Sequence, residues 1–202
     1  MPDPVYTVGH SVRPLADFID LLRQARVGVL VDVRRYPASR RHPQFGRDAL
    51  ASAVAGHGIA YEHEPDLGGR RQPRRDSPNT AWTQAVFRGY ADHMATPEFR
   101  EALARVQARA AEATVAVMCA EAVPWRCHRQ LIADALLAAG HRVMHILGVG
   151  GYAQHTLNPA GRLGPDGVLV YRAAEAGQTR LFASRGSAPA GAPAHRRSRR
   201  PR

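Results

Sequence analysis

The sequence predicts a single α/β domain in which a mostly parallel sheet is flanked by helices. Apolar, β-branched segments of strand length alternate with longer segments whose apolar residues recur at helical spacing. The chain has 202 residues without an evident repeat, which suits one domain. Hydrophobic residues make up 45% of it, as in globular proteins. We expect this domain over residues 1–183, followed by a disordered Arg-rich tail over 184–202.

The first half of the chain predicts three strands and two helices. Residues 4–8, PVYTV, are apolar and β-branched and predict a short buried strand that ends at Gly9. Residues 13–27 predict a helix, because their large apolar side chains recur at helical spacing. The next segment, VGVLVDVRR, is almost continuously apolar through Val33, which predicts a strand buried on both faces. The elements expected after it are a Pro- and Arg-rich loop over 36–48, a helix over 48–55, a strand over 59–65 and a polar loop over 66–79.

The second half continues the alternation. The elements expected are helices over about 80–94 and 97–113, a strand over 114–120, a helix over 127–140 and a strand over 141–147. Beyond Gly148 the pattern weakens, and the segments GVLVYR and TRLFA predict a terminal hairpin or edge pair. From Ser184 onward the chain holds six arginines, no acid and almost no large apolar side chain. Such a composition predicts disorder.

The charge and cysteine content narrow the class of protein. The net charge is +11, and all 28 basic residues are arginines. The tail carries +6 of this charge, which leaves a folded part that is only modestly basic, at +5. No apolar segment is long enough to cross a bilayer, and the N-terminus does not read as a signal peptide. Because two cysteines do not make a disulfide framework, we expect a cytoplasmic protein with reduced thiols and no membrane partner.

Polar residues follow each of the first three predicted strands. In an open parallel sheet, ligands bind beyond the carboxyl ends of the strands, so these residues are expected to meet at one edge. Arginines there would supply bidentate contacts to an anion. The expected substrate-binding residues are His10, Ser11, Asp32, Arg34, Ser39, Arg40, Tyr61, Gly69 and Arg70, together with Arg129 from the segment described next.

The segment VMCAEAVPWRCHR places both cysteines at one strand-to-helix turn. A helix N-terminus carries a partial positive charge and unpaired N–H groups, which favour a thiolate or a bound anion. Cys127 and His128 are expected to open this helix, opposite Cys119 and Glu121 at the strand end. A neighbouring carboxylate or imidazole serves to move protons. The expected catalytic residues are therefore Cys119, Glu121, Cys127 and His128.

Structural explanations compete with each of these assignments. Cysteine is among the most buried residue types, so Cys119 also fits a core position. The arginines also fit surface ion pairs, and Asp32 within an apolar strand needs only a structural partner. The C-x7-C-H spacing is not that of a zinc finger or ribbon, so no metal site is predicted. Neither G-x-G-x-x-G nor a P-loop is present, which leaves the cofactor unknown.

Five motifs in register resemble the domain of unknown function 488 family. They are YTVGHS, LVDVRRYPASRRHPQF, GIAYEHEPDLGGR, VMCAE and CHRQLIADAL, the last followed by GHRVMHI, and together they span residues 5–146. The resemblance implies a compact α/β domain and a set of motif residues, but no established reaction. The motif positions that it implies are His10, Ser11, Asp32, Arg34, Pro37, Ser39, Tyr61, Leu67, Gly68, Gly69, Arg70, Cys119, Glu121, Cys127, His128 and Arg129.

Three functions remain open from the sequence. The first is an enzyme with an anionic substrate: a nucleotide, a nucleic-acid component or a phosphorylated small molecule. The second is a nucleic-acid-binding module without catalysis, in which the tail and the arginine loop contact phosphates. Against it, no helix-turn-helix or RNA-recognition signature is present. The third is a ligand sensor that uses the same pocket without turnover. The oligomeric state is left open.

Overall fold

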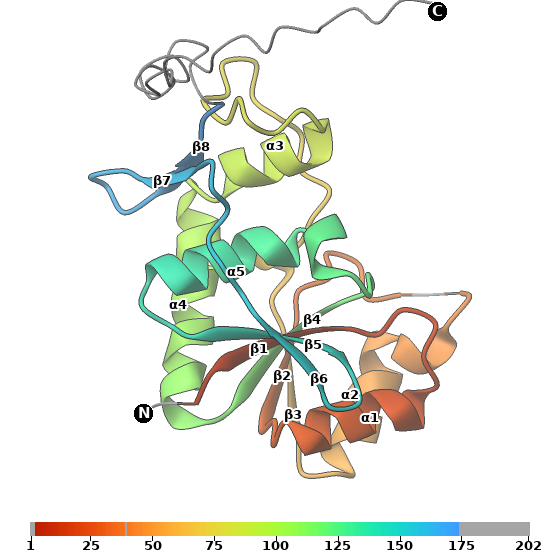
Figure 1. The fold of residues 1–202 in the computed structure, drawn as a ribbon. Helices are drawn as coiled ribbons and strands as arrows, with labels where there is room; N and C mark the ends of the chain where they lie inside the picture. Colours follow the sequence, from red (N-terminus) through yellow and green to blue (C-terminus); the bar gives the residue numbers. More distant parts are fainter. Residues whose placement is uncertain (1–2, 39, 174–202) are drawn as a thin grey trace, which may run out of the picture.

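A six-stranded sheet forms the centre of the protein (Figure 1). The structure, a computed structural model, describes residues 3–38 and 40–173. The strand order is β3-β2-β4-β1-β5-β6; the first five strands are parallel and β6 is antiparallel to β5. The strands are β1 Val5–Gly9, β2 Val29–Asp32, β3 Ala60–His63, β4 Val115–Cys119, β5 Val143–Gly148 and β6 Gly151–Gln154. The predicted mostly parallel sheet is confirmed.

Helices cover both faces of the sheet, as predicted. Figure 1 shows α1 and α2 on one face and α3, α4 and α5 on the other. The helices are α1 Leu15–Gln24, α2 Arg47–Ala55, α3 Ala85–His93, α4 Pro97–Glu112 and α5 Arg129–Ala138. Within the described ranges, none of the helices combines the length and the apolarity that a membrane crossing requires.

The strands divide the apolar residues between two cores. In β2, Val29 and Val31 pack with the α3–α5 side, whereas Leu30 packs with the α1–α2 side. The same alternation in β4 places Cys119 on the α5 side. This arrangement follows from the two-residue period of a strand. The nearly continuous apolar sequence of the central strands therefore reflects burial on both faces.

Two helices begin later than the sequence predicts. The helix expected from residue 80 starts at Ala85, because the Asn79 side chain donates to Asp92 and accepts from the Tyr171 amide. These bonds hold the preceding segment against β8 Leu169–Tyr171 instead of in a helix. The helix expected from Cys127 starts at Arg129. A 3-10 turn precedes it, and Cys127 itself has an extended backbone.

The C-terminal part differs in its pairing. The predicted strand in GVLVYR is present as β8, but its partner is β7 Gly161–Leu163. The sequence analysis predicted neither β7 nor β6, since both are very short and begin with glycine. The other expected partner, TRLFA, lies outside the described residues. So do the domain boundary at 183 and the tail over 184–202.

Gly9 brings β1 into direct contact with the loop that follows β4. A Cβ atom at Gly9 would lie 1.8 Å from the Glu121 carbonyl oxygen, far inside van der Waals contact. Only a residue without a side chain fits there. Beyond the sheet, the His10 amide donates to the Cys119 carbonyl at 3.1 Å and the Ser11 amide to the Ala120 carbonyl at 2.8 Å. The end of β1 and the end of β4 are thus held as one unit.

We expect Gly9→Ala to lower the free energy of unfolding by about 3 kcal/mol or more, the upper range for overpacked sites. The added methyl meets a backbone oxygen that cannot rotate away. Urea denaturation followed by tryptophan fluorescence measures the effect. Gly28→Ala is the matched control, because its nearest contact would be an ordinary 3.4 Å to the Ala113 Cβ. Equal free energies of unfolding for Gly9→Ala and Gly28→Ala would contradict the close approach of Gly9 to the Glu121 carbonyl oxygen.

Candidate functional site

A hollow of about 500 Å³ lies at the carboxyl ends of the parallel strands. It is the place where the sequence analysis expected loops to converge. Residues that follow β1, β2 and β3 line it together with the end of β4 and the residue before α5. The predicted site residues that line this pocket are His10, Ser11, Arg34, Gly69, Arg70, Cys119, Glu121 and His128.

A buried ion pair fixes one arginine in the pocket wall. Asp32 is fully buried at the end of β2, and its two oxygens accept from Arg34 Nε at 2.9 Å and Arg34 Nη2 at 2.5 Å. The Tyr61 hydroxyl donates to the same carboxylate at 2.7 Å. Such bidentate pairing sets the plane of a guanidinium group. Asp32 and Tyr61 therefore lie behind the pocket and act on it through Arg34.

His10 is the neutral neighbour of this arginine. Its ring stacks on Phe45 with centroids 4.2 Å apart, and its Nδ1 lies 2.9 Å from the Ser11 carbonyl. Burial, with a smaller contribution from the positive charge of Arg34, lowers the pKa of His10 to about 4. In the neutral ring Nδ1–H donates to Ser11, so Nε2 accepts from Arg34 Nη1 at 3.4 Å. His10 thus supports Arg34 without adding a charge.

The thiols of Cys119 and Cys127 are neighbours that share a hydrogen bond. Both cysteines are buried and free; Cys119 lines the pocket and Cys127 lies behind it. The hydrogen bond from Cys119 lowers the pKa of Cys127, with further contributions from His128 and Arg129. The same hydrogen bond, with burial, raises the pKa of Cys119. Two thiolates in contact repel each other, so the pair readily holds one thiolate but not two.

His128 faces the thiols with one ring nitrogen and the backbone with the other. Its Nδ1 lies 3.7 Å from Cys127 Sγ, and its Nε2 lies 3.3 Å from the Val33 carbonyl oxygen. A carbonyl only accepts, so Nε2 carries the proton in the neutral ring and Nδ1 presents a lone pair to the sulfur. Three possible metal ligands, Cys119, Cys127 and His128, have ligand atoms within 4.8 Å of one another.

Arg129 is buried beneath the loop that carries Cys119 and Glu121. Its Nη2 donates to the Glu121 and Ala122 carbonyls, and its Nη1 donates to the Thr7 hydroxyl at 3.1 Å. Within the described part of the chain its Nε has no hydrogen-bond partner. The side chain is 1% exposed and does not line the pocket. Its geometry holds the loop in place.

A chain of hydrogen bonds links this buried cation to a buried carboxylate. Because Arg129 donates to Thr7, the Thr7 hydroxyl is free to donate to His145 Nδ1 at 2.7 Å. His145 Nε2–H then donates to His155 Nδ1 at 3.0 Å, and His155 Nε2–H donates to Asp134 at 2.8 Å. All these bonds point the same way, from the positive end to the negative end. Burial lowers the pKa of His145 to about 4, which keeps it neutral in this chain.

Positive charge predominates around the pocket. Among the described residues that line it, four are arginines and one, Glu121, is acidic. Arg35, Arg41 and Arg70 are exposed at its rim, whereas Arg34 is buried in its wall. Clefts lined by one sign of charge concentrate ions of the opposite sign.

A comparison with protein-family models decides the family. The model described as "Domain of unknown function DUF488" matches residues 14–136, which is more than half of the chain. This chain belongs to the DUF488 family. The predicted resemblance is confirmed. Neither the curated proteins nor the solved structures contain a match to the chain.

The matched DUF488 region holds most of the pocket. It includes Arg34, Gly69 and Arg70 and the whole segment from Cys119 to Arg129, whereas His10 and Ser11 precede it. Among the other predicted site residues, Arg40 is exposed and does not line the hollow, and Ser39 lies outside the described residues. The sequence analysis missed Arg35, Arg41 and His42 as lining residues. Both arginines of the doublet Arg34–Arg35 line the hollow, but only Arg41 of the doublet Arg40–Arg41 does, and the sequence pattern gave no signal for this difference.

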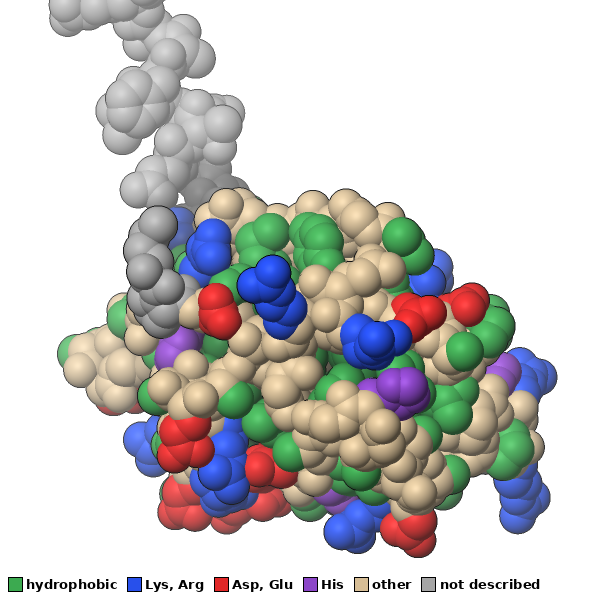
Figure 2. All heavy atoms as spheres, turned by 90° about the horizontal axis from the view of Figure 1, so that it is seen from below, with side chains coloured by type: hydrophobic (Ala, Val, Ile, Leu, Met, Phe, Trp, Pro, Cys, Tyr) green, Lys and Arg blue, Asp and Glu red, His purple; other side chains and the backbone are tan. Residues whose placement is uncertain are grey.

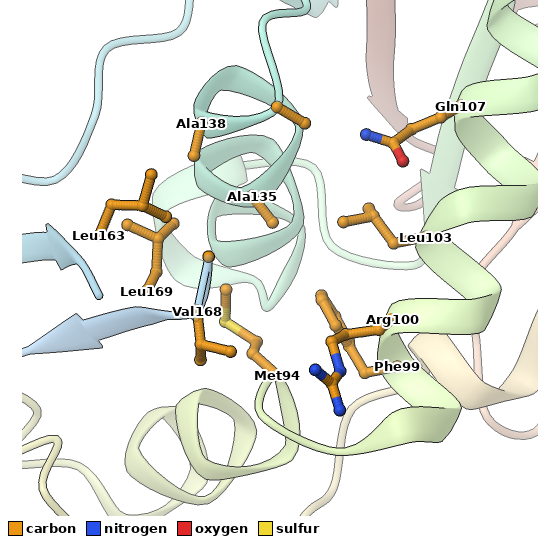
Figure 3. Close-up of a pocket in the computed structure, with 12 residues that line it drawn as sticks. Met94, Phe99, Arg100, Leu103, Gln107, Ala135, Ala138, Leu163, Val168 and Leu169 are labelled. Atoms are coloured by element: carbon orange, nitrogen blue, oxygen red, sulfur yellow. The ribbon is translucent and has the colours of Figure 1, made fainter. Parts of the chain in front are cut away.

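A second hollow in this DUF488 protein, of about 360 Å³, lies between α4, α5 and the β7–β8 pair (Figure 3). Figure 3 shows mainly apolar side chains around it, such as Leu103, Ala135 and Leu169, with Arg100 and Gln107 at its side. It contains none of the predicted site residues. The candidate functional site is therefore the pocket at the strand ends.

Two of the buried histidines, His10 and His145, predict how stability depends on pH. The folded pKa values of His10 and His145 are about 4, below the ordinary 6.5, so the unfolded chain binds more protons between these values. The free energy of unfolding should therefore fall as the pH drops from about 6.5 to 4. Each histidine contributes at most about 1.4 kcal/mol per pH unit.

Urea denaturation at pH 7, 6 and 5 measures this dependence. His10→Asn or His145→Asn should reduce the slope of stability against pH. His57→Asn, at an exposed position after α2, is the matched control and should leave the slope unchanged. An identical slope in all three variants would show that His10 and His145 do not cause the dependence of stability on pH.

Proposed function

We propose that this protein is a thiol-dependent enzyme that acts on a small anionic substrate. The observation that supports it most is that the pocket-facing Cys119 shares one hollow with four arginines. A volume of about 500 Å³ falls within the range of small-molecule sites. Nucleotides, nucleic-acid components and phosphorylated small molecules are the substrate classes that fit this size and charge.

Arg34 would hold the anionic group of the substrate. Asp32 and His10 fix its guanidinium group before any ligand arrives, so little side-chain entropy remains to be lost on binding. Arg70 and Arg41 at the rim would add attraction with less geometric control, since both are exposed. Binding of the anion next to Cys119 would place its reacting atom near the sulfur.

Cys119 would act as the nucleophile. As its sulfur forms the bond to the electrophilic atom of the substrate, the bond from that atom to the leaving group breaks, and the Cys119 proton moves to the neighbouring Cys127 thiolate. His128 Nδ1, 3.7 Å from Cys127 Sγ, accepts the proton of Cys127 when that thiolate first forms. Glu121 is exposed at the pocket and would transfer a proton from the solvent to the leaving group.

This chemistry requires reduced thiols, so the proposal places the protein in a reducing compartment such as the cytoplasm. A nucleic-acid-binding module without catalysis receives less support. The face of the molecule covered by α1 and α2 carries acidic and basic side chains interspersed, without a broad field of one sign (Figure 2). The arginine-rich tail, on which that alternative depends, lies outside the described residues.

Paired alkylating agents test the proposal. Iodoacetate and iodoacetamide have nearly the same size and transfer similar groups to a thiolate, but only iodoacetate is an anion. We expect the iodoacetate-to-iodoacetamide rate ratio at Cys119 to exceed that of free cysteine by about tenfold or more. The full chain is treated in the presence of a chelator, and mass spectrometry assigns the modified cysteine.

Arg70→Gln should lower this ratio about two- to threefold, because it removes one charge from the rim. Arg142→Gln, just before β5 at the opposite ends of the strands, is the matched control and should leave it unchanged. The difference between the rate ratio at Cys119 and that of free cysteine should also decrease as salt is added, because salt screens the arginine charges. A ratio equal to that of free cysteine, or a Cys119 that does not react in the folded protein, would refute the proposal.

A further inference from the structure

We propose that Cys119, Cys127 and His128 form a binding site for Zn²⁺, with a fourth coordination position open to the pocket. Two thiolates and one imidazole are ligands that zinc prefers. Three protein ligands with one position left open are the arrangement of catalytic rather than structural zinc sites. The inference rests on the ligand geometry and not on the nucleophilic role of Cys119.

The separations between the ligand atoms are close to those of a tetrahedral site. Zn–S bonds of about 2.3 Å and Zn–N bonds of about 2.0 Å place neighbouring ligand atoms about 3.5–3.8 Å apart. Cys127 Sγ and His128 Nδ1 are 3.7 Å apart, and all three ligand atoms lie within 4.8 Å of one another. The widest pair therefore needs to close by at most about 1.3 Å, a shift within the reach of rotations about side-chain bonds.

The imidazole is oriented as a metal ligand. Its Nε2–H points to the Val33 carbonyl oxygen at 3.3 Å, and its Nδ1 lone pair is directed toward the sulfurs. A hydrogen bond from the second ring nitrogen to a backbone carbonyl is the usual support of metal-bound histidines. It selects the correct tautomer before the metal binds.

Gly69 leaves space on the pocket side of this nitrogen. A Cβ atom at Gly69 would lie 2.9 Å from His128 Nδ1, which is closer than side chains approach each other. Since Gly69, Cys119 and His128 all line the pocket, the space that the missing side chain leaves belongs to it. A metal there is accessible to water or to an anionic ligand from the pocket.

The ligands come from rigid elements. Cys119 ends β4, which lies between β1 and β2 in the sheet, and the other two residues directly precede α5. Arg129, the first residue of α5, is tied to Thr7 and to the loop between the cysteines. The folded chain therefore presents the three ligands together, although seven residues lie between Cys119 and Cys127.

Charge balance favours a divalent ion. When Zn²⁺ binds, each cysteine releases its thiol proton and forms a Zn–S bond, so the two thiolates neutralise the two positive charges. The bound ion would occupy the lone pairs of both sulfurs. Zinc binding and attack by Cys119 on a substrate are therefore alternatives, and the metal would protect the thiols from alkylation.

Cobalt substitution tests the site. Untagged full chain is freed of metal with a chelator, reduced, and titrated with Co²⁺. We expect one equivalent to give the thiolate-to-cobalt charge-transfer band and the intense visible bands of a tetrahedral site. Zn²⁺ should displace the Co²⁺ and abolish these bands. A weak spectrum of octahedral, water-bound cobalt would overturn the proposal.

Variants assign the ligands. Cys127→Ser should reduce the charge-transfer intensity, and His128→Asn should weaken Co²⁺ binding at least about tenfold. Gly69→Ala should also weaken binding, and it changes no ligand atom. His57→Asn, at an exposed histidine, is the matched control. Circular dichroism confirms that each variant is folded. Unchanged spectra in the folded Cys127→Ser and His128→Asn proteins would also overturn the site.

The outcomes separate this inference from the proposed enzyme. Anion-selective alkylation without a tetrahedral cobalt spectrum would remove the metal site and leave the thiol mechanism. A tetrahedral cobalt spectrum without anion-selective alkylation would support the metal site and refute the thiol mechanism. If both are observed, Zn²⁺ should slow alkylation of Cys119 by iodoacetate in the native chain, and an unchanged rate would place the metal elsewhere.

Discussion

The site depends on a buried arginine that has no carboxylate in direct contact among the residues that the structure describes. Arg129 holds the loop between the two cysteines through carbonyl oxygens and holds β1 through Thr7. Removing a guanidinium group from water is costly unless its hydrogen bonds are replaced and its charge is balanced. Here the balancing charge is Asp134, reached through Thr7, His145 and His155. These aligned hydrogen bonds carry the attraction between Arg129 and Asp134 through the protein interior. They connect the loop between the two cysteines to Asp134 on α5.

Arg34 is also a buried arginine, but its charge is balanced by direct contact with a carboxylate. This contact, with Asp32, is bidentate. One edge of the Arg34 guanidinium group is therefore used in this ion pair, while the side chain also lines the hollow. Arg34 thus forms part of the pocket wall, whereas Arg129 holds the loop that follows β4 from behind the pocket. Because neither can be moved without exposing an unpaired charge, the loops that carry Cys119 and Glu121 have little freedom. This rigidity is what a site needs if its groups are to be in place before a ligand binds.

The cluster of Cys119, Cys127 and His128 is suited to two kinds of chemistry. Two thiols and an imidazole in contact stabilise a single thiolate, which suits a nucleophile, and they also supply the donor set of a zinc site. The two uses draw on the same lone pairs, so they exclude each other at any moment. The arginines around the pocket are compatible with both, since a bound anion would lie next to a sulfur in one case and next to an open metal position in the other.

The sequence by itself determined the alternation of strands and helices, the burial of the central strands on both faces, and the edge at which polar residues meet. These features follow from local periodicity and from the rule that parallel strands end on the same side. It also identified eight of the residues that line the pocket, in part through the family resemblance. Only the tertiary structure decided which residues face the hollow and which support it: Asp32, Tyr61 and Arg129 lie behind it, and Arg35, Arg41 and His42 line it. It also brought together Cys119, Cys127 and His128, three side chains that could hold a metal ion, although their spacing in the sequence is not that of a zinc finger or ribbon. The physical reason is that the direction of a side chain depends on contacts with residues that can lie more than a hundred positions away, as Arg129 lies from Thr7, and no local pattern records such contacts.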